Sequence, residues 1–279
     1  MILSSKFGVT KHNDVTVIKM QRSLFGQDLL HAYAFMYKDT LIDTGTDYSS
    51  TLLKQLAQQQ QIQKIFLTHH HEDHSGSAHS FNIPVFSSAK TAQIMRKGFK
   101  LKFYQKLLWG KMRVCECQTF SNENTIGNSM VKIIETPGHS DDHVAFFLPQ
   151  KKWLFSGDLF IHQKIKYFRR DEDFSKTIDS LQSVLSLDFT TLFCCHYGIV
   201  EQGKKALQNK LDHLLRIEDK VRTLHAEGLS IKQISRKLTK STSVVITFGD
   251  VSTNNLVYSI LHGARPRKDI HHILETTSK

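Results

Sequence analysis

Residues 68–76 read Thr-His-His-His-Glu-Asp-His-Ser-Gly and come directly after a short apolar run that predicts a buried strand. Imidazole and carboxylate groups are ligands that Zn²⁺, Fe²⁺ and Mn²⁺ accept. Alternate residues of an extended loop point the same way, so His69 and His71 are placed to bind one metal ion. Asp73 and His74, just beyond the turn, are placed to bind a second ion. A solvated loop is the alternative, but four ligand-type residues in this register favour a metal site.

Three later segments carry residues of the same chemical kind, each at the end of an apolar stretch. They are Glu135-Thr136-Pro137-Gly138-His139, Ser156-Gly157-Asp158 and Cys194-Cys195-His196-Tyr197-Gly198. Pro and Gly fix tight bends, so each segment places its polar residue where a strand turns. Each segment alone is typical of an ordinary turn, but their common order indicates that a sandwich fold gathers them at one edge.

The composition predicts a folded protein with one large domain and a smaller appendage. The 279 residues are 40% hydrophobic and 23% charged, which supports a sizeable core and excludes global disorder. No run approaches the roughly 18 apolar residues of a membrane-spanning helix, and we expect no signal peptide because the first residues lack an apolar segment. The four cysteines, at positions 115, 117, 194 and 195, do not form the pattern of a disulfide framework, so we expect a reducing, cytoplasmic location.

The apolar spacing predicts early strands with interspersed helices, as in a layered α/β sandwich. Strands are expected at residues 15–20, 29–37, 40–43, 62–68, 83–86, 130–136, 144–148, 152–155 and 191–195. Helices are expected at residues 48–60, 174–187, 204–226, 230–238 and 252–262. After residue 196 the pattern becomes almost entirely helical, which predicts a domain boundary near residue 202. It separates a catalytic domain, residues 1–202, from a helical C-terminal region, residues 203–279.

Together these motifs resemble the metallo-β-lactamase superfamily over roughly residues 15–200. The resemblance includes Leu41-Ile42-Asp43-Thr44-Gly45, which is similar to that family's strand-end aspartate motif. It implies the family's α/β fold, a four-layer αββα sandwich with the site at one edge. It also implies that His69, His71 and His139 hold the first metal ion, that Asp73, His74 and His196 hold the second, that Asp158 bridges both, and that Asp43 orients the ligands from behind.

The resemblance implies a hydrolase with two divalent metal ions, with Zn²⁺ as the expected metal and Fe or Mn as alternatives. Two ions that share a bridging water lower its pKa, and the resulting hydroxide attacks an acyl carbon or a phosphorus. Asp158, as the bridge, and Asp73, as a guide for the water proton, are the expected catalytic carboxylates. No Ser or Cys nucleophile is required. Because consecutive strand residues point oppositely, Cys194 and Cys195 are expected to be buried strand residues. His70 is expected to point away from the metal site.

The superfamily acts on thioesters, lactones, β-lactams, phosphodiesters and RNA, so the fold does not select a substrate. The H-x-H-x-D-H pattern is more typical of the hydroxyacylglutathione hydrolase-like branch. Residues 136–143, Thr-Pro-Gly-His-Ser-Asp-Asp-His, also resemble the β-lactamase-like endoribonucleases, with Asp142 and His143 expected to support the loop. A small thioester, ester or lactone is therefore the first hypothesis and an RNA phosphodiester the second. A nucleic-acid- or membrane-associated module with a structural metal site is the third hypothesis. It is the weakest, because a closed structural zinc site needs only about four ligands and seven are predicted here.

Residues 90–113 carry eight Lys or Arg and no acid, with aromatic residues interleaved. We interpret this stretch, the basic insert, as a solvated cap, as a surface for RNA or an anionic substrate, or as a helix for membrane or dimer contact. The net charge of +11 fits acidic partners without selecting one. A second basic cluster is either a carboxylate- or phosphate-binding site or a solvated loop; it contains Lys164, Lys166, Arg169 and Arg170.

The C-terminal region resembles the winged-helix-like region found in that branch. Residues 228–238 have the spacing of the first helix of a helix-turn-helix. A DNA-reading helix would have to follow closely, whereas residues 239–248 are β-branched and predict extended chain. We therefore expect a helical cap over the active site, and the oligomeric state stays open.

Overall fold

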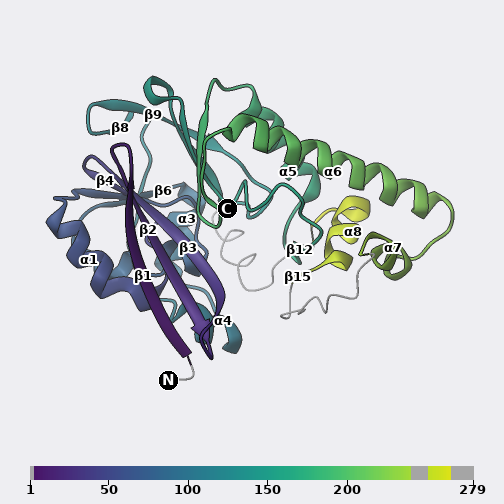
Figure 1. Ribbon diagram of the computed structural model, residues 1–279, viewed down its shortest axis with the longest axis horizontal. Helices are drawn as coiled ribbons and strands as arrows, with labels where there is room; N and C mark the ends of the chain where they lie inside the picture. The colour runs from purple at the N-terminus through teal and green to yellow at the C-terminus, as the bar shows by residue number, and fades with distance from the viewer. Residues whose placement is uncertain (1–2, 240–250, 265–279) are drawn as a thin grey trace, which may run out of the picture.

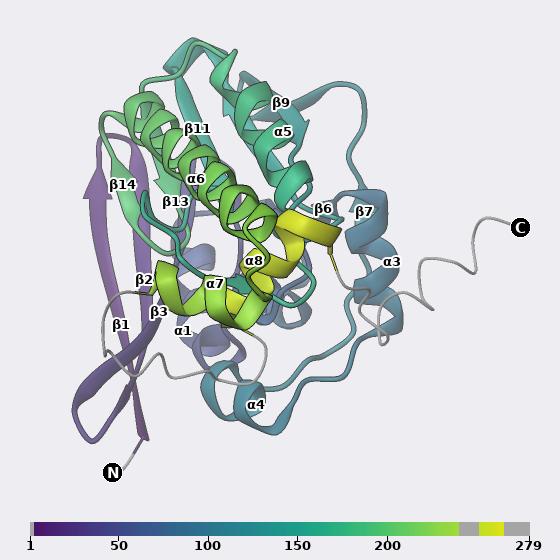
Figure 2. The same ribbon diagram turned by 90° about the vertical axis from the view of Figure 1, so that its right-hand side faces the viewer.

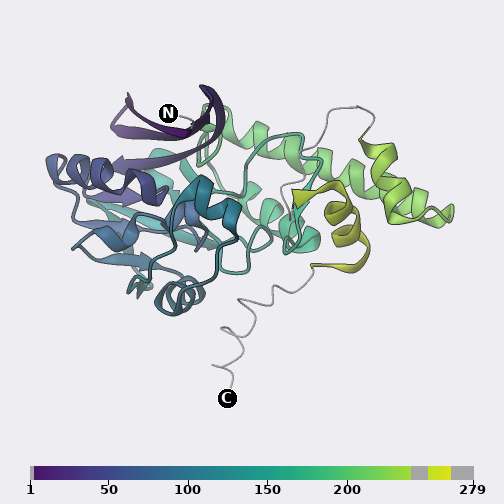
Figure 3. The same ribbon diagram turned by 90° about the horizontal axis from the view of Figure 1, so that it is seen from below.

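The computed structural model of the protein describes residues 3–239 and 251–264. Two β-sheets pack face to face, and helices cover the outer face of each sheet (Figure 1). The predicted α/β class and four-layer αββα sandwich are confirmed. The long helix α6 (Gly203–Ala226) crosses the outer face of the second sheet, and α7 (Ile231–Leu238) and α8 (Thr253–His262) pack near its far end (Figure 2). Seen from below, α6 runs from beside the N-terminal strands toward the other end of the molecule, where α7 lies (Figure 3).

The first sheet contains seven strands in sequential order. They are β1 (Leu3–His12), β2 (Val15–Leu24), β3 (Gln27–Tyr37), β4 (Thr40–Ile42), β5 (Lys64–Phe66), β6 (Val85–Ser87) and β7 (Gln118–Thr119). Strands β1 to β4 pair antiparallel, whereas β4 to β7 pair parallel because helices and loops cross between them. The sequence did not predict β1, because this edge strand is largely exposed and no residue in it is fully buried, although Phe7 packs partly against the core.

The second sheet has six strands in the order β14-β13-β11-β10-β9-β8. They are β8 (Asn124–Ile126), β9 (Ser129–Glu135), β10 (Val144–Leu148), β11 (Trp153–Gly157), β13 (Thr191–Cys194) and β14 (Gly198–Val200). A small separate sheet pairs β12 (Phe168–Arg169) with β15 (Val251–Ser252). This small sheet joins the loop after β11 to the start of α8.

The predicted helices are all present. The remaining helical elements are η1 (Asp47–Ser49), α1 (Ser50–Gln59), α2 (Glu72–Ser75), η2 (Ala78–Ser80), α3 (Ala89–Lys97), α4 (Phe103–Trp109), η3 (Pro149–Lys151) and α5 (Phe174–Leu185). The basic insert thus forms two short helices, because Gly98 ends α3 with a positive φ of 73°. Within the described residues, no helix is long and apolar enough to cross a membrane.

Three hydrophobic layers hold these four structural layers together. Aromatic rings fill the layer between the sheets, where Phe35 and Phe155 meet with centroids 5.6 Å apart. Leu53 of α1 belongs to the layer outside the first sheet, and Leu181 of α5 and Leu207 of α6 belong to the layer outside the second. The domain boundary near residue 202 stays a prediction. The extended chain predicted for residues 239–248 falls, apart from its first residue, outside the described residues.

Lys210 attaches α6 to the loop that follows β11. Its Nζ donates a hydrogen bond to the carbonyl oxygen of Leu159, 2.6 Å away, and the residue is only 2% exposed. Burial lowers the pKa of Lys210 to about 8, although Glu172, Cys194 and Asp158 act in the opposite direction. Burial of this ammonium group therefore lowers the free energy of unfolding at neutral pH.

We expect Lys210→Met to remove a pH-dependent part of the stability. The pKa of Lys210 is about 8 in the folded protein against 10.5 ordinarily, so the unfolded chain binds more protons between these values. The free energy of unfolding should rise by about 3 kcal/mol across this window, and the penalty should be complete below it. Urea unfolding from about pH 7.5 to pH 10.5 measures the rise, with exposed Lys205→Met as the control. The same rise in wild type and Lys210→Met would contradict this account.

Candidate metal centre

The histidine-rich segment lies just beyond the end of β5, at one edge of the sandwich. Its backbone is extended at His71 (φ −57°, ψ 149°) and becomes helical at α2. The extended part brings the rings of His69 and His71 together, with centroids 4.5 Å apart. The first turn of α2 then carries Asp73 and His74, and all four side chains are buried. The structure therefore has the predicted change of direction between the two pairs.

Three imidazoles form the first group of donor atoms. Nδ1 of His71 lies 2.9 Å from Nε2 of His69 and 2.9 Å from Nε2 of His139. Burial lowers the pKa of both His69 and His71 well below the ordinary value, and the neighbouring groups His74 and Arg169 add to the effect. These two imidazoles are therefore neutral, which is the form that binds a metal ion.

A second group combines nitrogen, oxygen and sulfur atoms. One atom each from His74, Asp158, Cys195 and His196 lies within 4.8 Å of the other three. Asp73 adjoins this group, with its Oδ2 3.3 Å from Nε2 of His196. Burial disfavours the charged form of His196, but the Asp158 and Asp73 carboxylates raise its pKa well above the ordinary value. The arrangement thus concentrates carboxylate charge where a cation would sit.

Asp158 lies between the two groups. Its Oδ1 is 3.3 Å from Nε2 of His74, and its Oδ2 is 3.2 Å from Nε2 of His139. Burial opposes ionisation of Asp158, yet His196, His74 and His139 hold its pKa well below the ordinary value, so it is a carboxylate. The structure therefore brings all seven predicted ligand residues together, and their roles as ligands stay a prediction.

Two buried atoms in this cluster indicate that it fits metal ions. Nε2 of His74 and Oδ1 of Asp158 face each other at 3.3 Å, but neither atom makes a hydrogen bond, whereas buried polar atoms nearly always make one. A metal ion would satisfy both atoms. Imidazole and carboxylate donors are also the set that Zn²⁺, Fe²⁺ and Mn²⁺ accept.

Comparison with known proteins agrees with this geometry. The profile of the metallo-beta-lactamase superfamily matches residues 38–196, more than half of the chain. The chain belongs to the metallo-β-lactamase superfamily. A metallo-beta-lactamase from Pontibacter korlensis superposes with a TM-score of 0.56 at 20% identity, covering 75% of this chain and 98% of that one. A metallo-beta-lactamase family protein from Thermus thermophilus gives 0.58 at 17% identity, covering 93% and 91%.

Several curated relatives are similar in sequence. A beta-lactamase-like protein 2 homolog from Caenorhabditis elegans is 25% identical, covering 66% of this chain and 60% of the relative. An atrochrysone carboxyl ACP thioesterase from Passalora fulva is 28% identical, covering 75% and 59%. A hydroxyacylglutathione hydrolase from Pectobacterium carotovorum is 30% identical, covering 56% and 55%. The aligned part of this metallo-β-lactamase superfamily chain thus spans less than two thirds of each relative's length.

Asp43 lies behind the metal loop, where the resemblance to the superfamily placed it. Its Oδ2 is 2.8 Å from Nδ1 of His74, and its Oδ1 accepts a hydrogen bond from the Thr68 backbone N–H at 2.8 Å. Asp43 therefore fixes the ring of His74 so that Nε2 faces the cluster.

Asp142 and His143 support the loop, as expected. Asp142 accepts a hydrogen bond from the backbone N–H of His70 and lies 2.9 Å from its Nδ1, so His70 is turned to this partner. His143 Nε2 accepts a hydrogen bond from the Asp158 backbone N–H at 3.0 Å. Burial lowers the pKa of His143 to about 3, which keeps the ring neutral and able to accept this bond.

Glu172 is a supporting carboxylate that the sequence did not reveal. Its Oε1 lies 2.6 Å from Nδ1 of His139, and its Oε2 accepts a hydrogen bond from the backbone N–H of Arg169. Its carbonyl oxygen accepts a hydrogen bond from the Ser259 hydroxyl of α8 at 2.9 Å. The C-terminal helix α8 thus braces a residue that orients His139. No motif surrounds Glu172, so only the hydrogen bonds identify it.

We expect Glu172→Gln to weaken metal binding by about 10–100-fold, because the amide replaces the carboxylate that orients His139. Titration of apo protein with Zn²⁺ against a competing chelator measures the dissociation constant. Asp188→Asn is the control, since Asp188 forms an exposed ion pair with Lys152 at 2.8 Å. Unchanged zinc affinity in Glu172→Gln would show that the orientation of His139 does not depend on this charge.

The basic insert covers the metal loop. Gln105 of α4 donates a hydrogen bond to Oε1 of Glu72 at 2.7 Å, and the Phe99 ring lies 5.0 Å from the ring of His70. A pocket of about 530 Å³ opens in the insert; it is lined by Lys97, Gly98, Phe99, Lys100, Met112 and Val114. The aromatic ring of Phe99 thus contacts the loop that carries the predicted ligands, and the same ring lines a pocket with two lysines.

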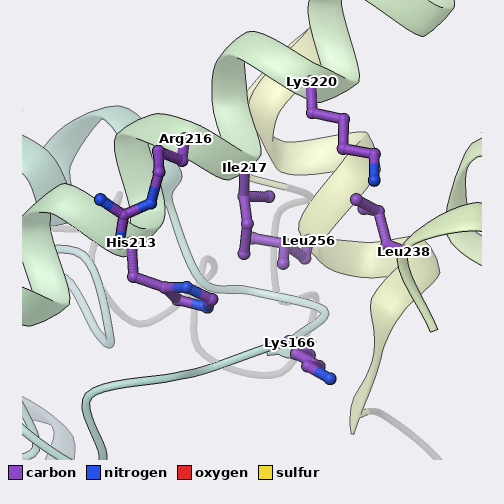
Figure 4. Close-up of a pocket in the computed structure, with 7 residues that line it drawn as sticks. All are labelled: Lys166, His213, Arg216, Ile217, Lys220, Leu238 and Leu256. Carbon is purple, nitrogen blue, oxygen red and sulfur yellow. The ribbon is translucent and has the colours of Figure 1, made fainter. Parts of the chain in front are cut away.

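The structure divides the second basic cluster. Nε of Arg169 lies 3.5 Å from Oδ1 of Asp171. Burial disfavours the charged guanidinium, but the carboxylates of Asp171, Glu72 and Glu172 raise the pKa of Arg169. Lys166 instead lines a separate pocket of about 230 Å³ between the loop before β12 and the C-terminal helices. Figure 4 shows the pocket residues Lys166, His213, Arg216, Ile217, Lys220, Leu238 and Leu256. Its lining combines basic groups with an apolar floor.

Proposed function

We propose that the protein is a dinuclear metal-dependent hydrolase that acts on a small thioester, ester or lactone. The observation that carries this proposal is the position of Asp158. One carboxylate oxygen faces His74 of the second donor group, and the other faces His139 of the first. A carboxylate placed between two donor groups is suited to bridge two metal ions.

In this proposal His69, His71 and His139 hold one ion, and Asp73, His74 and His196 hold the other. When bound, the two ions supply an activated water and polarise the carbonyl that it attacks. The Asp73 carboxylate, next to His196, orients that water and receives its proton. Asp43, His143 and Glu172 keep the ligands in place from behind. Zn²⁺ is the proposed metal, and the proposed location of the protein is the cytoplasm.

The names of the relatives support an acyl substrate. One is named a thioesterase for an ACP-bound product and another a hydroxyacylglutathione hydrolase. Both names describe release of an acyl group from a carrier. The basic pockets would hold an anionic part of such a carrier, with Lys97 and Lys100 in the first and Lys166 and Lys220 in the second. RNA is the alternative polyanion for the same surfaces.

A substrate panel tests the proposal. Protein loaded with Zn²⁺ or Mn²⁺ is assayed with thioester, lactone, β-lactam, phosphodiester and RNA, and its metal content is measured. We expect close to two ions per chain and turnover of the thioester or the lactone that changes little with salt. Activity on RNA alone, with affinity that falls steeply from low to physiological salt, would favour the nuclease instead. One ion or none after supplementation would contradict a dinuclear enzyme.

We expect replacement of Lys97, Lys100 and Lys102 by Gln to raise KM for an anionic substrate and to reduce its salt dependence. The value of kcat should stay nearly unchanged, because groups that bind the distant part of a substrate stabilise ground and transition states alike. Exposed Lys132, Lys205 and Lys232 replaced by Gln form the control, which removes the same charge elsewhere. Wild-type KM on the whole panel would leave the insert as a structural cap.

A further inference from the structure

A cysteine thiol lies among the donor atoms of the second group. Cys195 is 1% exposed, and its sulfur lies within 4.8 Å of the ligand atoms of His74, Asp158 and His196. Strand β13 ends at Cys194, and Cys195 begins the turn that follows. Consecutive side chains point to opposite faces only within a strand, so this rule does not keep the side chains of Cys195 and His196 apart. Cys195 is buried as expected, but it lies one residue beyond the strand in which it was predicted.

The neighbouring cysteine shows the difference. Cys194 is also buried, but its sulfur contacts the carbonyl oxygen of Phe160. It also accepts hydrogen bonds from the backbone N–H groups of His196 and Tyr197, at 3.4 and 3.3 Å. Cys194 therefore closes the turn, whereas the thiol of Cys195 is directed at the donor cluster.

The spacing of the cluster matches a coordination site. Around a tetrahedral ion with bonds of about 2.1 Å, neighbouring ligand atoms lie about 3.4 Å apart. Oδ1 of Asp158 lies 3.3 Å from Nε2 of His74, and its other oxygen, Oδ2, lies 3.4 Å from Nε2 of His196. Nε2 of His74 and Oδ1 of Asp158 are buried, face each other at 3.3 Å and make no hydrogen bond, which is the arrangement of two atoms that share a metal ion.

We propose that Cys195 is a sulfur ligand of the second metal ion, the one assigned to Asp73, His74 and His196 with Asp158 as the bridge. This inference rests on the proposed function, since it requires a metal ion in the second group. On binding, the thiol would release its proton to solvent and coordinate as a thiolate. A thiolate is a softer donor than the carboxylates and imidazoles around it, so it would favour Zn²⁺ over Mn²⁺ at this position.

Cobalt substitution tests the proposal. Apo protein is loaded with two equivalents of Co²⁺, and a thiolate ligand is expected to produce a near-ultraviolet charge-transfer band. The band should be lost in Cys195→Ser and retained in Cys194→Ser and in Cys115→Ser. An absent band in cobalt-loaded wild type, or a full band in Cys195→Ser, would overturn the assignment.

X-ray absorption of the zinc-loaded wild type gives a second readout that needs no variant. A sulfur neighbour at about 2.3 Å from zinc is the expected result. Bound zinc with nitrogen and oxygen neighbours alone would refute the sulfur ligand and leave the proposed hydrolase standing. If neither zinc nor cobalt binds, the proposed function itself fails, so the two failures are distinguishable.

Discussion

Replacing Asp158 by asparagine is expected to remove hydrolysis while the fold persists. The amide has the size of the carboxylate but lacks the charge that faces His74, His139 and His196. Loss of a group that stabilises charge at the reacting centre lowers kcat on the order of 10³-fold. The variant should also bind fewer than two metal ions, because no carboxylate joins the two donor groups.

Steady-state kinetics on the best panel substrate, metal analysis and circular dichroism measure these effects. Asp141→Asn is the matched control, since Asp141 forms an exposed ion pair with Lys176 at 2.6 Å nearby. Near-normal turnover with two bound ions in Asp158→Asn would show that the bridging assignment is wrong.

Gly157→Ala is expected to disrupt the same centre through the backbone. Gly157 has a φ of +47°, and an added Cβ would lie 2.5 Å from Nε2 of His143 and 3.0 Å from the Thr68 side chain. That Nε2 accepts the hydrogen bond from the Asp158 backbone, so the methyl group would displace both residues. We expect a loss of about 3 kcal/mol or more in the free energy of unfolding, and loss of metal binding.

Gly228→Ala separates backbone strain from the steric clash. Gly228 has a φ of +85°, but an added Cβ would meet nothing within 4 Å. The control should therefore lose only about 1–2 kcal/mol and keep its metal ions. Urea unfolding and metal analysis compare the two variants. Equal losses of stability with metal retained in both would show that the space beside His143 is not restrictive.

The sequence alone was enough for the family, the layered fold and the set of predicted ligands. The predicted ligands can be read from the sequence because each His or Asp directly follows an apolar strand. Several such residues in this order are typical of a metal site. Regular apolar spacing likewise predicted α5 and α6, whose buried faces follow a helical period. The exposed strand β1 was missed because it buries little apolar surface, mainly at Phe7, and so leaves only a weak period in the sequence.

Only the tertiary structure decided which residues support the predicted ligands and what surrounds them. Glu172 reaches His139 from a segment without a motif, and Gln105 reaches Glu72 from the basic insert. Cys195 turns toward His74 because β13 ends one residue earlier, so a rule for strands does not apply to it. Contacts between residues distant in the chain depend on how the two sheets and the C-terminal helices pack. Local patterns in a sequence record the face a residue presents within its own element, and they do not record which partner from another element meets it.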